Sequence, residues 1–163
     1  MTTKTVLIAD DHSIVRAGLR LLIERDGAFH VVAEAADGRE AVKLATEHAP
    51  QIVVMDIAMP LLNGIEATRQ IAAECPRTAV IVLSMHHDVS YVVRALQAGV
   101  KAFVLKESAE GELLTALDAV SAGRTYFSSK VRTLLATGPA TRMRNEGLPD
   151  SLELLTGRER EVL

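Results

Sequence analysis

The chain has 163 residues, 48% of them hydrophobic and 3% aromatic, with a formal net charge of −3 and an isoelectric point near 6.0. This length fits one domain of about 100 to 150 residues with an appendage. The weak negative charge argues against nucleic-acid binding through bulk charge. The single cysteine, Cys75, excludes an internal disulfide, and no apolar run reaches the roughly 18 residues of a membrane span. We therefore expect a cytoplasmic protein with an aliphatic core and no membrane partner.

Apolar patterns along the chain predict five strands that alternate with five helices. The predicted strands are residues 5–9, 29–35, 51–55, 79–83 and 102–105. Residues 29–35 alternate in part, as expected of an outer strand. The other four are continuous apolar runs, typical of strands covered on both faces. Apolar residues at helical spacing predict helices at about residues 13–26, 38–48, 62–74, 88–98 and 108–122. The alternation predicts an α/β fold, a doubly wound five-stranded parallel sheet with helices on both faces.

Polar residues follow four of the predicted strands directly. They are Asp10 and Asp11 after the first strand, Asp56 after the third, Ser84 after the fourth and Lys106 after the fifth. Because the carboxyl ends of parallel strands meet at one edge of a sheet, we expect these side chains to lie together. Three carboxylates this close repel one another unless a cation neutralises them. Carboxylate oxygens, with no His or Cys at the strand ends, favour Mg²⁺ over a softer metal.

These strand ends, and the turn after the third strand, resemble the receiver domain of two-component response regulators. The residues that match in order and spacing are Asp10, Asp11, Asp56, Met59, Pro60, Gly64, Ser84 and Lys106. The resemblance covers residues 4 to about 122, and we interpret residues 1–122 as a phosphoacceptor receiver domain. It implies the flavodoxin-like or CheY-like strand order 2-1-3-4-5.

The resemblance implies a phosphotransfer chemistry for the site. Asp56 is the expected phosphoacceptor, Lys106 pairs with the phosphoryl group, and Ser84 donates a hydrogen bond to it. The expected donor is a phosphohistidine on a sensor histidine kinase, or a small acyl phosphate. The protein is then a switch with self-phosphorylation and slow autodephosphorylation only, not an enzyme in the ordinary sense.

The resemblance also implies a ligand set for Mg²⁺. Asp11 binds the ion directly and Asp10 binds it through water, while Asp56 and the backbone carbonyl of Ala58 complete the set. Two positions are expected to tune the lifetime of the phosphorylated state. Ala58 offers no group toward an attacking water, and His86 faces the site from the loop after the fourth strand.

Two residues are expected to carry the signal away from the site. Ser84 moves toward the phosphoryl group, and Phe103, three residues before Lys106, rotates into the space that Ser84 leaves. The alternative for Phe103 is a permanently buried core ring. We expect the face around the fourth helix, fifth strand and fifth helix to control formation of a homodimer, or release of a DNA-binding domain, on phosphorylation.

The composition changes after Gly123. Residues 123–154 predict a partly helical linker, in which residues 125–129 lead into a short helix through Val131, Leu134 and Leu135. Residues 155–163 resemble the start of the helix-turn-helix DNA-binding domain of the NarL/FixJ (LuxR-type) regulators, with an ordinary amphipathic helix as the alternative. Because the recognition helix would follow them, we expect no DNA-binding residue among these 163. DNA binding and transcription control are expected of the intact protein.

The sequence leaves two other functions open. In a magnesium phosphohydrolase, the same carboxylates would process a small-molecule substrate. Ala58 disfavours this alternative, because it stands where a second acid/base carboxylate is expected. The second alternative is a receiver that only binds proteins, which would not need Asp56, Ser84 and Lys106.

Overall fold

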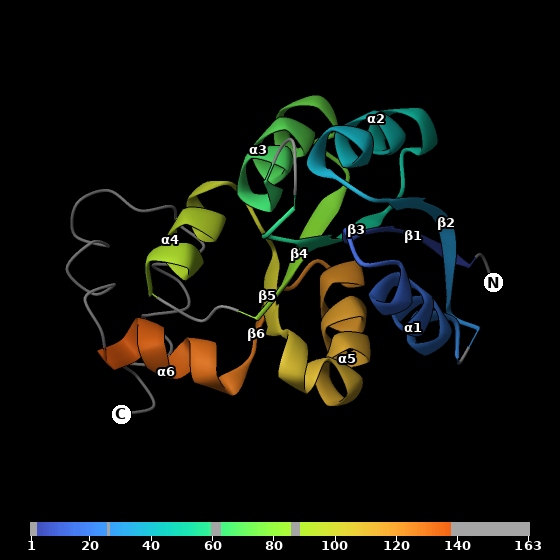
Figure 1. Cartoon of the computed structure of the whole chain (residues 1–163). Coiled ribbons are helices and arrows are strands. Elements are labelled where there is room, and N and C mark those ends of the chain that lie inside the picture. The colour runs from blue at the N-terminus through green and yellow to red at the C-terminus, as the bar shows by residue number, and fades with distance from the viewer. Residues whose placement is uncertain (1–2, 26, 60–62, 86–88, 138–163) are drawn as a thin grey trace.

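A six-stranded sheet forms the centre of the protein (Figure 1). The computed structural model describes residues 3–25, 27–59, 63–85 and 89–137. The strands are β1 (Lys4–Ala9), β2 (Phe29–Ala35), β3 (Ile52–Asp56), β4 (Ala79–Ser84), β5 (Ala102–Leu105) and β6 (Tyr126–Phe127). Their order is β2-β1-β3-β4-β5-β6, and every neighbouring pair is parallel. The predicted parallel α/β sheet is confirmed, including the order of its first five strands.

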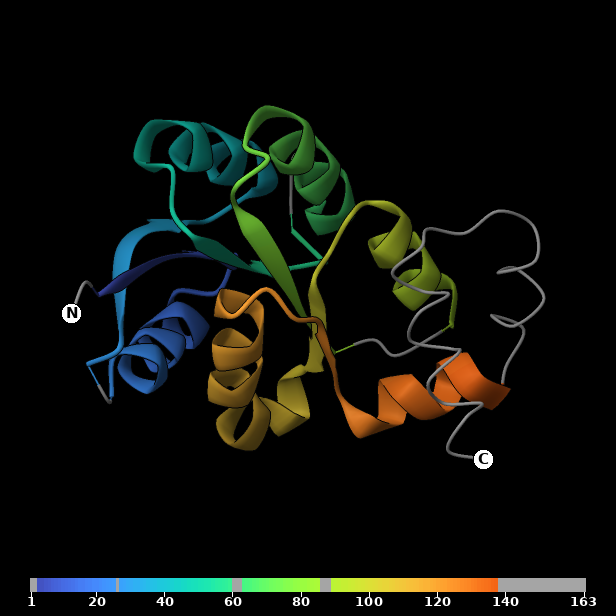
Figure 2. The same ribbon diagram turned by 180° about the vertical axis from the view of Figure 1, so that it is seen from behind.

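Helices cover both faces of the sheet (Figures 1 and 2). They are α1 (Ser13–Glu24), α2 (Gly38–His48), α3 (Gly64–Glu74), α4 (Val89–Gln97), α5 (Ala109–Ser121) and α6 (Ser129–Thr137), and a 3₁₀ turn, η1 (Lys106–Ser108), precedes α5. Helices α1 and α5 lie side by side on one face, whereas α2, α3 and α4 lie on the other, with α6 next to α4. The five predicted helices are all present.

Two apolar clusters, one on each face of the sheet, hold these layers together. Successive residues of a strand point to opposite faces, so Leu7 packs with the layer of α2, α3 and α4. Its neighbours Val6 and Ile8 pack with α1 and α5. The strands are apolar throughout because both of their faces are covered. Continuous apolar runs in the sequence therefore identified them.

The sixth strand is a difference from the sequence prediction. The sequence predicts that residues 125–129 lead into a helix, but Tyr126 and Phe127 pair with β5, where Phe127 lies opposite Phe103. Two residues are too few to show a strand pattern, so the open edge of β5 decides this pairing. The predicted short helix follows as α6, and its Val131 and Leu135 are buried in the core.

Several predictions fall outside the described residues. They concern Pro60, His86, the second part of the linker and the start of the helix-turn-helix domain at residues 155–163. The domain boundary after residue 122 stays a prediction. Within the described ranges, no helix has both the length and the apolar content required to cross a lipid bilayer.

Candidate functional site

The carboxyl ends of four strands lie at one edge of the sheet. Across the sheet, Ala9 pairs with Met55, Asp56 pairs with Leu83, and Ser84 pairs with Leu105. The polar residues that end or follow these strands are therefore neighbours along the edge: Asp10, Asp56, Ser84 and Lys106. Segments that are far apart in the sequence supply a single site.

A charged cluster occupies this edge. Nζ of Lys106 lies 2.9 Å from Oδ2 of Asp10 and 3.4 Å from Oδ2 of Asp56. Asp10 and Asp56 are buried, with only 1% and 5% of their surface exposed. The contact to Asp10 is an ion pair without an aligned hydrogen bond, since Oδ2 has no hydrogen-bond partner among the described residues. One ammonium group thus faces two buried carboxylates.

Burial and charge shift the ionisation of this cluster. Burial raises the pKa of Asp56 above its ordinary value; Lys106 opposes this shift and the Asp10 carboxylate adds to it. Burial by itself would lower the pKa of Lys106, but the interactions with Asp10 and Asp56 outweigh it and raise that pKa. Lys106 is therefore protonated at neutral pH. A second cation at this edge would favour the ionised form of Asp56.

Four side chains at this edge are placed to bind a cation together. Asp10, Asp11, His12 and Asp56 each offer one ligand atom, and these atoms all lie within 4.8 Å of one another. The buried Oδ2 of Asp10 lies 2.9 Å from the Lys106 ammonium and can also accept from a metal-bound water. Three carboxylates fit a hard divalent cation. The acidic cluster at this edge therefore fits the Mg²⁺ that the sequence predicts.

His12 belongs to the cluster, which corrects the sequence analysis, because that analysis counts no His at the strand ends. Its backbone N–H donates to Oδ1 of Asp10 at 2.9 Å, and its Nδ1 lies 3.0 Å from Oδ1 of Asp11. The only signal in the sequence is its place directly after the acidic pair. His12 thus orients Asp10 through the backbone, and its ring meets the carboxylates from the solvent side.

Arg16 is a second residue that the sequence analysis does not identify. Its Nη1 donates to the backbone carbonyl of Asp10 at 2.6 Å, and its Nε donates to Oε1 of Glu34 at 3.1 Å. The sequence pattern places Arg16 only on the polar side of a helix, because Glu34 reaches it from β2. Arg16 therefore connects the loop that carries Asp10 and Asp11 to β2.

The loop after β3 folds back too closely for a side chain at Gly64. The N–H of Gly64 donates to the carbonyl of Ile57 at 2.8 Å, and a Cβ at Gly64 would clash with the backbone of Asp56 and Ile57. The N–H of Ala58 donates to Oδ1 of Asp56 at 3.3 Å. This loop holds Asp56 in place and leaves Ala58 exposed beside it. The role of the Ala58 carbonyl as a metal ligand stays a prediction.

The two expected switch residues are both buried. Ser84 ends β4 at the same edge and is 1% exposed. Phe103 lies inside β5 and is fully buried, with Phe127 of β6 and apolar residues of α4 and α6 in the same cluster. In this conformation Phe103 is a core ring, as the alternative reading has it, and its rotation stays a prediction.

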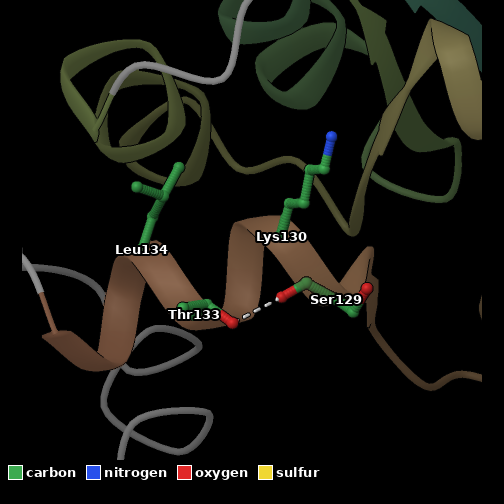
Figure 3. A pocket seen from close by; sticks show the side chains of 4 residues that line it. All are labelled: Ser129, Lys130, Thr133 and Leu134. Atoms are coloured by element: carbon green, nitrogen blue, oxygen red, sulfur yellow. Dashed lines mark hydrogen bonds between the residues drawn. The ribbon is translucent and has the colours of Figure 1, made fainter.

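A hollow lies beside α6, away from the acidic edge (Figure 3). Its volume is about 330 Å³, and its described lining consists of Ser129, Lys130, Thr133 and Leu134. Leu134 points toward α4, and the hydroxyl of Thr133 donates to the carbonyl of Ser129 at 3.0 Å. Lys130 pairs with Glu107 at 2.9 Å. These side chains form no shared ligand set with the acidic edge, and we assign the hollow no binding role.

Comparison with known proteins agrees with the geometry of this edge. Residues 6–118 match the response regulator receiver domain. The chain is 36% identical over 171 residues to the transcriptional regulatory protein DegU of Brevibacillus brevis, an alignment that covers 97% of this chain and 72% of that protein. It is 34% identical over 161 residues to the oxygen regulatory protein NreC of Staphylococcus haemolyticus, with 97% and 74% covered.

A solved structure supports the same assignment. A two-component response regulator of the LuxR family from Aurantimonas sp. SI85-9A1 superposes with a TM-score of 0.78 at 41% identity, covering 81% of this chain and 94% of that one. Fold and site together define a receiver domain. The chain belongs to the response regulator family of two-component systems; DegU is a transcriptional regulatory protein, and the Aurantimonas structure is of the LuxR family.

Proposed function

We propose that Asp56 is the phosphoacceptor of this response regulator and that a sensor histidine kinase, or a small acyl phosphate, is the donor. The observation that carries the proposal is the buried Asp56 carboxylate at the end of β3, 3.4 Å from the Lys106 ammonium and beside a second buried carboxylate, Asp10. A buried carboxylate with a raised pKa beside an ammonium group is a candidate for a reactive group.

The transfer step exchanges one bond to phosphorus for another. An oxygen of Asp56 forms the new bond, and the bond from phosphorus to the donor nitrogen or acyl oxygen breaks, with its electron pair leaving on the donor. Lys106 stabilises the equatorial oxygens by charge, and Ser84 donates a hydrogen bond to one of them. Asp10, Asp11, Asp56 and the carbonyl of Ala58 would hold Mg²⁺, which would further neutralise the phosphoryl oxygens.

The reverse reaction returns the carboxylate. Water attacks phosphorus, the bond to Asp56 breaks, and inorganic phosphate leaves. Ala58 is exposed beside Asp56 and offers no acid or base to this water, so hydrolysis is slow and the protein acts as a switch without turnover of a substrate. His86 is the other position proposed to tune this lifetime.

The phosphorylated form differs from the free form mainly in charge. The phosphoryl group adds roughly −1.5 to −2 charges. Ser84 moves toward it, and Phe103 repacks in response. We propose that this change favours a homodimer and controls DNA binding by the intact, cytoplasmic protein through a helix-turn-helix domain that begins near residue 155, after a receiver domain at residues 1–122 and a linker at 123–154.

Intact-mass measurement tests the phosphoacceptor. The chain is incubated with acetyl phosphate and Mg²⁺, and one added phosphate is expected. Asp56→Asn should abolish the addition, because the amide cannot form an acyl phosphate. Asp118→Asn is the matched control: it makes the same change at an exposed position on α5 and should keep the wild-type mass gain.

Other outcomes would contradict the proposal. Continued release of inorganic phosphate from several phosphate esters would indicate a magnesium phosphohydrolase. A mass that stays unchanged, with no response to beryllium fluoride and Mg²⁺ in a thermal unfolding scan, would indicate a receiver that only binds proteins.

A further inference from the structure

One imidazole ring lies within the carboxylate cluster at the carboxyl edge of the sheet. Nδ1 of His12 is 3.0 Å from Oδ1 of Asp11 and 3.3 Å from Oδ1 of Asp10. Among the described residues, these three side chains and Asp56 are the one group of three or more His, Cys, Asp or Glu placed to hold a metal ion together. The edge therefore offers both carboxylate oxygens and a ring nitrogen to a metal ion.

The separations between His12 and the two carboxylates are those of neighbouring ligands on one ion. With metal–ligand bonds of about 2.0–2.2 Å, two neighbouring ligand atoms lie about 3–3.5 Å apart. The distances from Nδ1, 3.0 Å and 3.3 Å, fall within this range. The same distances also fit hydrogen bonds from a ring N–H, so a measurement on the ring nitrogen itself has to separate the two roles.

Asp10 presents different oxygens to Lys106 and to His12. Nζ of Lys106 lies 2.9 Å from Oδ2, whereas the backbone N–H and the ring of His12 meet Oδ1. The His12 side chain is 67% exposed, so its ring can turn toward an ion without leaving a packed position. An ion at the solvent side of the cluster would thus face His12, while Lys106 keeps its contact with the other oxygen of Asp10.

A nitrogen ligand changes which metal ions the edge prefers. Mg²⁺ is a hard cation that takes oxygen ligands and keeps several waters, so a ring nitrogen adds little to its binding. Imidazole nitrogen suits Zn²⁺, which proteins commonly hold with four ligands drawn from nitrogen, sulfur and carboxylate oxygen. The four side chains of this cluster match that number and those types. Because His12 stands among them, the edge is not restricted to a hard cation.

We propose that the carboxyl edge of the sheet also binds Zn²⁺, with His12 as the nitrogen ligand, in competition with Mg²⁺. Asp10, Asp11 and Asp56 supply the oxygen ligands. Both ions need the same carboxylates, so one ion excludes the other. A Zn²⁺ ion held by four protein side chains uses an oxygen of Asp56 and leaves no position open for a phosphoryl oxygen. Together with the proposed function, on which this last step rests, Zn²⁺ therefore opposes phosphorylation of Asp56.

Calorimetric titration of the 163-residue chain with Zn²⁺ and, separately, with Mg²⁺ tests the nitrogen ligand. The wild type should bind Zn²⁺ at least about tenfold more tightly than Mg²⁺. His12→Asn replaces the ring nitrogen with an amide oxygen and keeps the backbone N–H that donates to Asp10. It should lower the ratio of the Mg²⁺ to the Zn²⁺ dissociation constant about tenfold or more. His48→Asn, at the exposed end of α2, is the matched control and should keep the wild-type ratio.

Two further measurements locate the bound Zn²⁺. Asp11→Asn should weaken the binding of both ions, because both use this carboxylate. Spectra of the ¹⁵N-labelled histidine rings report on the nitrogen directly, and the signal of His12 is identified by its absence from His12→Asn. The Nδ1 signal of His12 should move much further with Zn²⁺ than with Mg²⁺, since the ring binds only Zn²⁺.

Intact mass measures the competition between the two ions. With acetyl phosphate and saturating Mg²⁺, added Zn²⁺ should reduce the phosphate on the wild type. His12→Asn should need about tenfold more Zn²⁺ for the same reduction, in line with its weaker Zn²⁺ binding. His48→Asn should respond to Zn²⁺ as the wild type does.

The outcomes separate the inference from the proposed function. Equal losses of Zn²⁺ and Mg²⁺ binding in His12→Asn would show that His12 only positions the carboxylates, and would overturn the inference. Zn²⁺ binding that ignores His12→Asn would assign the ion to other side chains and overturn it as well. Zn²⁺ bound through His12 without loss of phosphate would overturn the competition. A wild type that never gains phosphate overturns the proposed function, while calorimetry and the ring spectra still decide the Zn²⁺ site.

Discussion

Helices α6 and α1 both bury apolar side chains, in opposite layers of the same sheet, but α1 also carries large apolar side chains that face solvent. On α6, Val131 and Leu135 are 0% and 1% exposed. On α1, Ile14 and Leu21 remain largely open to solvent. A segment whose composition predicts a linker thus completes the core, whereas the first helix of the receiver keeps large apolar side chains exposed. Distance along the chain from the receiver motifs does not decide which segments hold the domain together.

The largest change in the free energy of unfolding is expected when a buried side chain on α6 is shortened. Leu135→Ala should lower the free energy of unfolding by about 2–4 kcal/mol, because it removes buried methyl groups and leaves a cavity. Leu21→Ala is the matched variant on α1 and should change the free energy of unfolding of the monomer by no more than about 0.5 kcal/mol. Urea unfolding followed by circular dichroism measures both. Equal losses for the two variants would remove the contrast between the helices.

A second prediction concerns the charge of Asp56 at the carboxyl edge of the sheet. Without added metal at pH 7, Asp56→Asn should raise the free energy of unfolding by about 1–3 kcal/mol, because it removes a buried carboxylate whose charge is poorly compensated. Burial raises the pKa of Asp56, so the folded state binds more protons than the unfolded state. Stability of the wild type therefore falls as pH rises from the ordinary Asp pKa through the raised one.

Unfolding curves at a series of pH values show whether the stability of the wild type falls as pH rises, as predicted. The gain in free energy of unfolding of Asp56→Asn over the wild type should shrink toward acid pH, where Asp56 is protonated in both the folded and the unfolded state. The same gain should shrink when Mg²⁺ is added. A wild type that gains stability from this group as pH rises would show that Lys106 already compensates the charge fully. Asp118→Asn, at an exposed position, serves as the control.

A smaller gain is expected at the centre of α1. Gly18→Ala should raise the free energy of unfolding of the monomer by about 0.5–1 kcal/mol, since alanine restricts the unfolded chain and its Cβ meets no neighbour. The measurement is urea unfolding at a concentration where the chain is monomeric. A loss of stability would show that glycine serves the fold of α1 itself, which would weaken the comparison with α6.

The smallest effect is expected for the ion pair between α6 and the turn after β5. Lys130→Gln should lower the free energy of unfolding by no more than about 0.5 kcal/mol, because Lys130 and Glu107 are both more than half exposed. Thermal unfolding at low and high salt measures it. A loss as large as that of Leu135→Ala would mean that charge, and not burial, holds α6 in place.

The sequence by itself determined the repeated strand and helix units and the residues at the strand ends. Buried parallel strands must be apolar on both faces, so they are visible as continuous runs. Parallel strands also present their carboxyl ends at one edge, so Asp10, Asp56 and Lys106 could be grouped before any coordinates were known. The order of the strands along the sheet, in contrast, came from the resemblance to receiver domains.

Only the tertiary structure decided the remaining features. β6 forms because β5 has a free edge, not because two residues carry a strand pattern. Arg16 on α1 reaches Glu34 on β2, and Leu21 is exposed although its neighbour Leu22 is buried. These outcomes depend on which elements become neighbours in space, and contacts between distant segments leave no periodic trace in a single sequence.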